Sequence, residues 1–158
     1  MGYRKNKTRK VMNDWEQKFL PKLKKWHGTH SKIVFHKLMK KSSTLKTSLK
    51  KRSKEYEVEF DISLKEIREE MYKVYGKGCV YCKEPIKIQN MVCDHIIPIS
   101  LGGASTVQNL QLICNRCNRR KGPLTDKQFG KLLLFLSRQS TTMSNYVLRK
   151  LSKADVMS

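Results

Sequence analysis

Long hydrophobic runs are absent from this sequence of 158 residues, in which the longest apolar stretch runs only from Leu132 to Leu136. A helix that crosses a membrane needs about 20 apolar residues, so the sequence predicts no membrane span. The positively charged N-terminus is not followed by an apolar segment and lacks the pattern of a secretory signal. Both absences lead us to expect a cytoplasmic protein that does not contact membranes.

Acidic residues are also scarce, with 13 Asp and Glu against 34 Lys and Arg, for a formal net charge of +21. Residues 1–54 contain 18 basic and 2 acidic side chains, whereas residues 55–122 contain 10 and 9, and residues 123–158 contain 6 and 2. A concentrated positive surface binds polyanions by releasing counterions. Residues 1–54 are therefore predicted to bind nucleic acid, the alternative being a solvated, partly disordered tail.

The basic segment also carries an apolar pattern. Trp15, Phe19, Leu23 and Trp26 recur at nearly helical spacing, although Pro21 interrupts them. A stripe of this kind is more often a face that docks on a core than a surface that stacks on bases. We therefore divide the chain into a basic, partly helical extension, residues 1–54, and a second domain, residues 55–158.

Capping residues and periodicity predict the remaining elements. Ser63 and Glu66 form a capping box at the start of a helix. Asn13 and Ser31 resemble helix starts as well. The other predicted elements are a lysine-rich helix at 43–54, a strand at 56–60, the capped helix from residue 63 to about residue 75, and helices at 125–136 and 142–151.

Four of the five cysteines form two Cys-x-x-Cys pairs, Cys79 with Cys82 and Cys114 with Cys117. Two such pairs supply the four sulfur ligands of a tetrahedral Zn²⁺ site, which leaves no position for water or substrate. The sequence thus predicts a structural zinc ion, and two disulfides are the alternative. Cys93 is expected to be a small buried residue.

Between and within the cysteine pairs lies a series of polar motifs. It reads Asp94-His95, then Pro98, Gly102-Gly103 and Asn109-Leu110, and it ends with Cys-Asn-Arg-Cys-Asn-Arg-Arg-Lys-Gly at residues 114–122. This series resembles the HNH endonuclease family over residues 79–122. Any single element would be weak evidence, but their combined order is specific.

The resemblance implies an α+β fold built on a ββα-metal module with structural zinc, flanked by helices and by the basic extension. A first strand would end near His95, and a second would run from Asn109 to Ile113. A helix carrying Asn118 would follow, and residues 125–152 would form C-terminal helices.

The resemblance also implies the roles of four residues. His95 would be the general base, because a neutral imidazole accepts a proton from water near pH 7. Asp94 and Asn118 would hold a catalytic Mg²⁺ or Mn²⁺ with their oxygen atoms. Asn109 would fix the loop that orients the histidine.

A basic cluster lies on or beside the helix that carries Asn118. Cations at these positions are expected to contact DNA phosphates, although a solvated face is the alternative. The residues are Arg116, Arg119, Arg120 and Lys121.

Taken together, these features predict a metal-dependent homing or phage endonuclease that hydrolyses double-stranded DNA in a bacterial or phage-infected cell. Two alternatives stay open: a zinc-ribbon protein that binds nucleic acid without cleaving it, and a nuclease subunit of a phage packaging complex. A second copy of the chain is a further candidate partner. One active site per chain favours nicking over a double-strand break.

Overall fold

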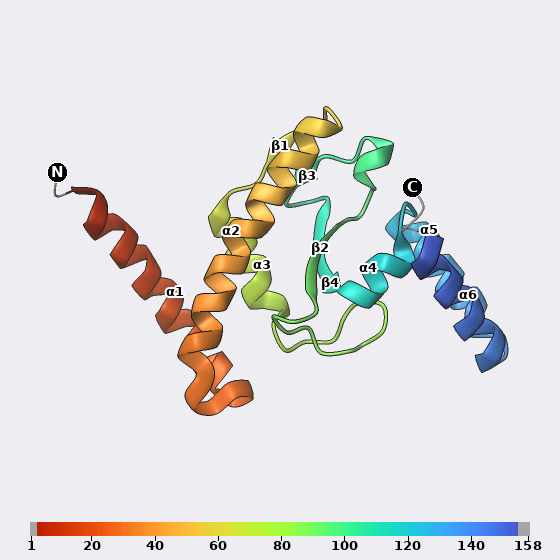
Figure 1. Ribbon diagram of the computed structural model, residues 1–158, viewed down its shortest axis with the longest axis horizontal. Helices are drawn as coiled ribbons and strands as arrows, with labels where there is room; N and C mark the ends of the chain where they lie inside the picture. Colours follow the sequence, from red (N-terminus) through yellow and green to blue (C-terminus); the bar gives the residue numbers. More distant parts are fainter. Residues whose placement is uncertain (1–2, 155–158) are drawn as a thin grey trace.

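The computed structural model describes the backbone of residues 3–154 and the side chains of residues 14–152. Its helices are α1 (Tyr3–His27), α2 (Ser31–Glu55), α3 (Leu64–Val74), α4 (Asn115–Lys121), α5 (Asp126–Leu136) and α6 (Thr141–Ala154). Its strands are β1 (Phe60–Asp61), β2 (Met91–His95), β3 (Ser105–Thr106) and β4 (Leu110–Cys114), and 3-10 turns lie at η1 (Gly28–His30) and η2 (Ile99–Leu101). Figure 1 shows α1 and the α5–α6 pair at opposite ends, with the β2–β4 hairpin between them.

Helices α1 and α2 form a hairpin that packs on α3 through the apolar stripe. Phe19 and Leu23 are fully buried, and the Phe19 ring lies 5.2 Å from that of Tyr72 in α3. The predicted break at Pro21 is wrong, because α1 continues through this exposed residue. A proline removes only one backbone hydrogen bond, and the buried stripe on both sides of it holds the helix together.

Two predicted boundaries in this region also differ from the structure. Helix α1 runs through Asn13 instead of starting there, and the side chain of Asn13 lies outside the described residues. The lysine-rich helix expected at 43–54 is the second half of α2, which begins at Ser31 as predicted. The expected strand at 56–60 is replaced by a turn and the short β1, because Glu57 adopts a positive φ of 53°.

An apolar cluster joins the helical hairpin to the rest of the described chain. It includes Phe35 and Leu38 from α2, Met71 from α3 and Ile113 from β4. Residues 1–54 therefore share a core with the residues that follow. The predicted division at residue 54 stays a proposal that the N-terminal segment has a separate function, the binding of nucleic acid.

The ββα arrangement is confirmed. Strands β2 and β4 pair antiparallel, with His95 opposite Leu110 and Asp94 opposite Gln111, and α4 follows β4 directly. Strands β1 and β3 form a second, parallel pair. The fold is thus the mixed α+β class that the sequence predicted.

The C-terminal helices and the caps also agree with the sequence. The capping box at Ser63 and Glu66 is present, and a second one forms between Thr125 and Gln128 at the start of α5. Helix α6 packs against α4 and starts one residue earlier than expected. Among the described residues, no helix is both long enough and apolar enough to cross a membrane.

Candidate active site and zinc centre

The four paired cysteines converge at one end of the β2–β4 hairpin. The Sγ atoms of Cys79, Cys82, Cys114 and Cys117 all lie within 4.8 Å of one another, and those of Cys82 and Cys114 are 3.5 Å apart. Zinc–sulfur bonds of about 2.3 Å in a tetrahedron place sulfur atoms about 3.8 Å apart. All five cysteines lie among the described residues and are free thiols. The cluster is consistent with structural zinc and not with the disulfide alternative.

Local backbone geometry forms the two knuckles that carry these thiols. In the first, Cys79 accepts a hydrogen bond from the backbone N–H of Lys83 at 2.9 Å and donates its own to Glu84 at 2.8 Å. In the second, Cys114 caps α4, and its Sγ accepts from the N–H of Cys117 at 3.4 Å. The zinc centre therefore anchors the start of α4, the helix that carries Asn118.

His95 ends β2 and is almost completely buried, with 4% of its surface exposed. Its Nε2 atom lies 2.9 Å from the hydroxyl of Ser105, which accepts a hydrogen bond from Ser53 of α2 at 2.7 Å. Burial, and then the positive charges of Arg52 and Lys121, lower the pKa of His95 to about 4. The imidazole is therefore neutral at physiological pH.

Asp94 is buried beside His95 and is held on both carboxylate oxygens. Lys121 Nζ lies 3.2 Å from Oδ1 and 3.1 Å from Oδ2, and Gln111 donates to Oδ2 at 3.0 Å. Burial raises the pKa of Asp94, while the Gln111 hydrogen bond and the Lys121 charge act in the opposite direction. Lys121 also donates to the backbone carbonyl of His95 at 2.8 Å, so one ammonium group fixes both neighbours.

Asn109 fixes the loop that leads away from His95. Its side chain accepts from the N–H of Ile97 at 2.8 Å and donates to the carbonyls of Ile97 at 3.1 Å and Ala104 at 2.9 Å. The loop passes so close that a Cβ atom at Gly103 would lie 1.8 Å from the Ile97 carbonyl oxygen. A glycine is thus required where the predicted Gly-Gly turn meets Asn109.

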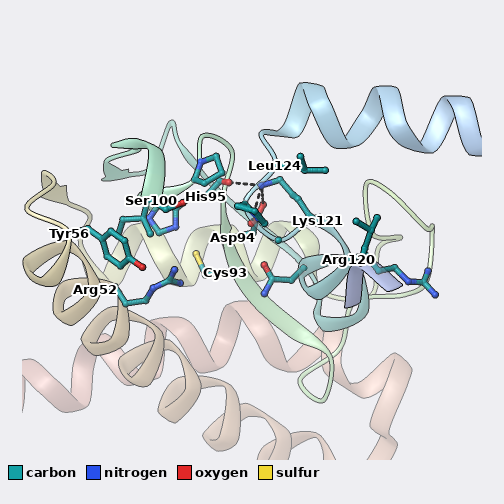
Figure 2. A pocket seen from close by; sticks show the side chains of 15 residues that line it. Arg52, Tyr56, Cys93, Asp94, His95, Ser100, Arg120, Lys121 and Leu124 are labelled. Carbon is teal, nitrogen blue, oxygen red and sulfur yellow. Dashed lines mark hydrogen bonds and ion pairs between the residues drawn. The ribbon is translucent and has the colours of Figure 1, made fainter. Parts of the chain in front are cut away.

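Asn118 lies on α4 and faces the same hollow as Asp94 and His95. This hollow has a volume of about 670 Å³, and its wall also includes Arg120 of α4. Figure 2 shows the Asp94–Lys121 pair beside the hollow and the contact of Lys121 with His95. The structure therefore brings Asp94, His95 and Asn118 to one site, while Asn109 stands behind it in the loop.

The four basic residues predicted to bind DNA lie in different environments in the structure. Lys121 does not lie on the surface, because it is only 1% exposed and is paired with Asp94. Arg116 forms an ion pair with Glu84 at 3.0 Å beside the zinc centre. Arg119 is exposed, and Arg120 is half-buried, with an Nε atom that has no hydrogen-bond partner among the described residues. Their contacts with DNA stay predictions, but Lys121 is an internal cation.

Comparison with known proteins agrees with this geometry. Residues 79–134 match a family described as "HNH endonuclease". This segment is an HNH endonuclease domain. The chain is also similar to the CRISPR-associated endonuclease Cas9 of Corynebacterium diphtheriae, with 44% identity over 45 residues. The similarity covers 28% of this chain and only 4% of that much longer protein. No solved structure matches the chain.

The surroundings of Asp94 and His95 contain supporting residues that the sequence analysis missed. Ser53 and Ser105 come from outside the family motifs, and only the tertiary structure places them behind His95. Gln111 had a detectable signal, because it is a polar residue within the apolar run of β4 and lies opposite Asp94 in the hairpin. Its amide also donates to Tyr81 at 2.9 Å and Asp126 at 3.2 Å.

Proposed function

We propose that this chain is a metal-dependent endonuclease that hydrolyses phosphodiester bonds of double-stranded DNA. The observation that carries the proposal is the convergence of neutral His95 with Asp94 and Asn118 on one hollow. A general base must be unprotonated at working pH, and the buried imidazole meets this requirement.

In this proposal, His95 takes the proton of the attacking water through Nδ1. In this tautomer Nε2 carries the ring hydrogen and donates a hydrogen bond to the Ser105 hydroxyl, which fixes the tautomer and the orientation of the ring. A partner on one ring nitrogen is how proteins select the reactive nitrogen on the other. Asn109 acts as a positioning residue, because its three hydrogen bonds hold the loop next to His95.

Asp94 and Asn118 are the proposed ligands of the catalytic cation. A carboxylate and an amide oxygen are hard donors that suit Mg²⁺ or Mn²⁺. Oδ1 of Asp94 is contacted by Lys121 alone and so has a second lone pair for a cation. When bound, such an ion stabilises charge on the scissile phosphate and the leaving oxygen.

The helical hairpin is the proposed DNA-binding surface. Its buried stripe faces the core, so the exposed lysines that have no ion pair among the described residues form a basic face on α1 and α2 that is fixed relative to the active site. These lysines are Lys24, Lys25, Lys32, Lys37, Lys40, Lys50 and Lys54. Each phosphate contact made by this face would add about 0.9 to the magnitude of the slope in a plot of the logarithm of the binding constant against the logarithm of the salt concentration. Arg119 and Arg120 are proposed to contact phosphates nearer the site.

The decisive experiment compares wild-type protein with His95→Ala on supercoiled plasmid in Mg²⁺ or Mn²⁺. We expect wild type to produce nicked circles first, since one site cuts one strand at a time. His95→Ala should abolish cutting while zinc content and DNA affinity persist. His36→Ala, at an exposed position on α2, is the matched control and should cut normally. Normal cutting by His95→Ala would refute the assigned mechanism.

One observation favours a second candidate, a zinc-containing DNA-binding protein without catalysis. Lys121 already neutralises Asp94, so a divalent cation must bind beside an ammonium group. Tight, salt-sensitive DNA binding by the wild type, with no cleavage at any Mg²⁺ or Mn²⁺ concentration, would support this candidate over the nuclease.

A further inference from the structure

We propose that Arg52, near the C-terminal end of α2, is an active-site residue that contacts the phosphate being cleaved. This inference rests on the proposed nuclease function and adds to it a residue from outside the HNH domain. Arg52 precedes the matched segment by 27 residues, so no family motif includes it.

The placement of Arg52 in the hollow is the first argument. Arg52 on α2 and Tyr56, the residue that caps the C-terminal end of α2, line the same hollow as Asp94, His95 and Asn118. Figure 2 shows Arg52 and Tyr56 on one side of this hollow and Lys121 and Arg120 on the other. The positive charge of Arg52 also contributes to the low pKa of His95, which places the guanidinium within electrostatic reach of the base.

The second argument is that the charge of Arg52 is available. Lys121 is paired with Asp94 and Arg116 with Glu84, whereas Arg52 forms no ion pair with any described side chain. A cation next to a buried imidazole, with no carboxylate to balance it, favours the binding of an external anion. A DNA phosphate in the hollow would be that anion.

The third argument is that α2 is fixed to the base itself. Ser53, the residue after Arg52, donates to Ser105, and Ser105 is the hydrogen-bond partner of His95. This chain of two buried hydroxyls links the helix that carries Arg52 to the imidazole. The backbone of Arg52 is thereby held in a set position relative to the proposed general base.

The chemistry of a guanidinium fits this position. Arginine can donate two parallel hydrogen bonds to the oxygens of one phosphate, and it keeps its charge at any working pH. As water attacks, negative charge grows on those oxygens. A preorganised donor therefore stabilises the transition state more strongly than it stabilises the complex with uncleaved DNA. Arg52 would thus act on the cleavage rate and not on affinity alone.

The test is a single-turnover cleavage assay at saturating DNA with Arg52→Gln, Arg52→Lys and Lys51→Gln. Lys51→Gln is the matched control, because it removes the same charge from the neighbouring exposed residue of α2, which does not line the hollow and is not part of the proposed DNA-binding face. We expect Arg52→Gln to slow cleavage by about 100-fold, the size seen when a transition-state donor is removed. Arg52→Lys should recover part of the rate, and Lys51→Gln should keep the wild-type rate.

Zinc content and thermal melting, which should not change at this exposed position, check that each variant is folded. If Arg52→Gln cleaves saturating DNA at the rate of Lys51→Gln, the inference is wrong, and Arg52 is an ordinary DNA-binding residue. Wild type and His95→Ala are assayed in parallel. If His95→Ala is inactive while Arg52→Gln is fully active, only the Arg52 inference fails. If His95→Ala cleaves like wild type, the proposed function fails first.

Discussion

Lys121 Nζ lies 3.1 Å from a carboxylate oxygen of Asp94, and both side chains are buried in the interior of the HNH domain. The same ammonium group donates to the carbonyl of His95. A sequence motif suggests a phosphate-binding lysine here, but the folded chain uses it to hold two adjacent site residues in place. The predictions below test this arrangement and the contacts around it.

Breaking the Asp94–Lys121 pair should destabilise the protein. Lys121→Met leaves the Asp94 carboxylate buried without its cation, and loss of one partner of a buried pair costs about 3 kcal/mol. Denaturant unfolding in the presence of zinc measures the change. The double variant Lys121→Met, Asp94→Asn should recover part of this loss, since no charge is then left unpaired. Stability of Lys121→Met within about 0.5 kcal/mol of wild type would mean that the pair is not as described.

Removing the hydroxyl behind the base should slow cleavage without unfolding the protein. Ser105→Ala deprives His95 Nε2 of its partner and frees the ring to rotate. An unsatisfied buried group costs about 1–3 kcal/mol, so we expect a rate loss of about 10-fold. Ser53→Ala, one hydroxyl further away, should have a smaller effect. Ser48→Ala at an exposed position of α2 is the control, and a rate for Ser105→Ala equal to this control would argue against a role for the hydroxyl.

Cleavage should persist into mildly acidic solution. An unperturbed histidine loses its base form below pH 6.5, whereas the pKa of His95 is lowered to about 4. The acid limb of the rate profile should therefore fall near the lower value. Single-turnover rates between pH 4.5 and 7.5, with DNA binding measured at each point, provide the test. A midpoint near pH 6.5 with full binding would contradict the buried, neutral state of His95.

Removing zinc should unfold the β2–β4 hairpin and α4 together. Cys117→Ser takes one thiolate from the cluster, and structural zinc sites supply on the order of 10 kcal/mol of folding free energy. We expect loss of zinc, of near-UV circular dichroism and of cleavage, with no recovery in excess Mg²⁺. Cys93→Ser is the matched control, because Cys93 is not part of the cluster. Retention of zinc and structure in Cys117→Ser would show that the cluster does not hold the metal.

Local patterns in the sequence determined much of this protein. The Cys-x-x-Cys spacing predicted the zinc cluster, the capping box at Ser63 predicted the start of α3, and the resemblance of the motifs around His95 to the HNH family implied the ββα module. Each of these depends on contacts between residues close in sequence, or on a motif whose spacing reflects the metal. Such features can be read before the chain is folded.

Tertiary structure alone decided which side chains surround those motifs. Pro21 did not end α1, because long-range burial of the apolar stripe outweighed a local preference. Ser53 reaches Ser105, 52 residues away, and Lys121 turns inward to Asp94, because packing brought these groups together. The sequence shows directly that a lysine or arginine carries a positive charge. Whether this charge faces DNA or the interior depends on how distant segments pack, and no local sequence pattern predicts it.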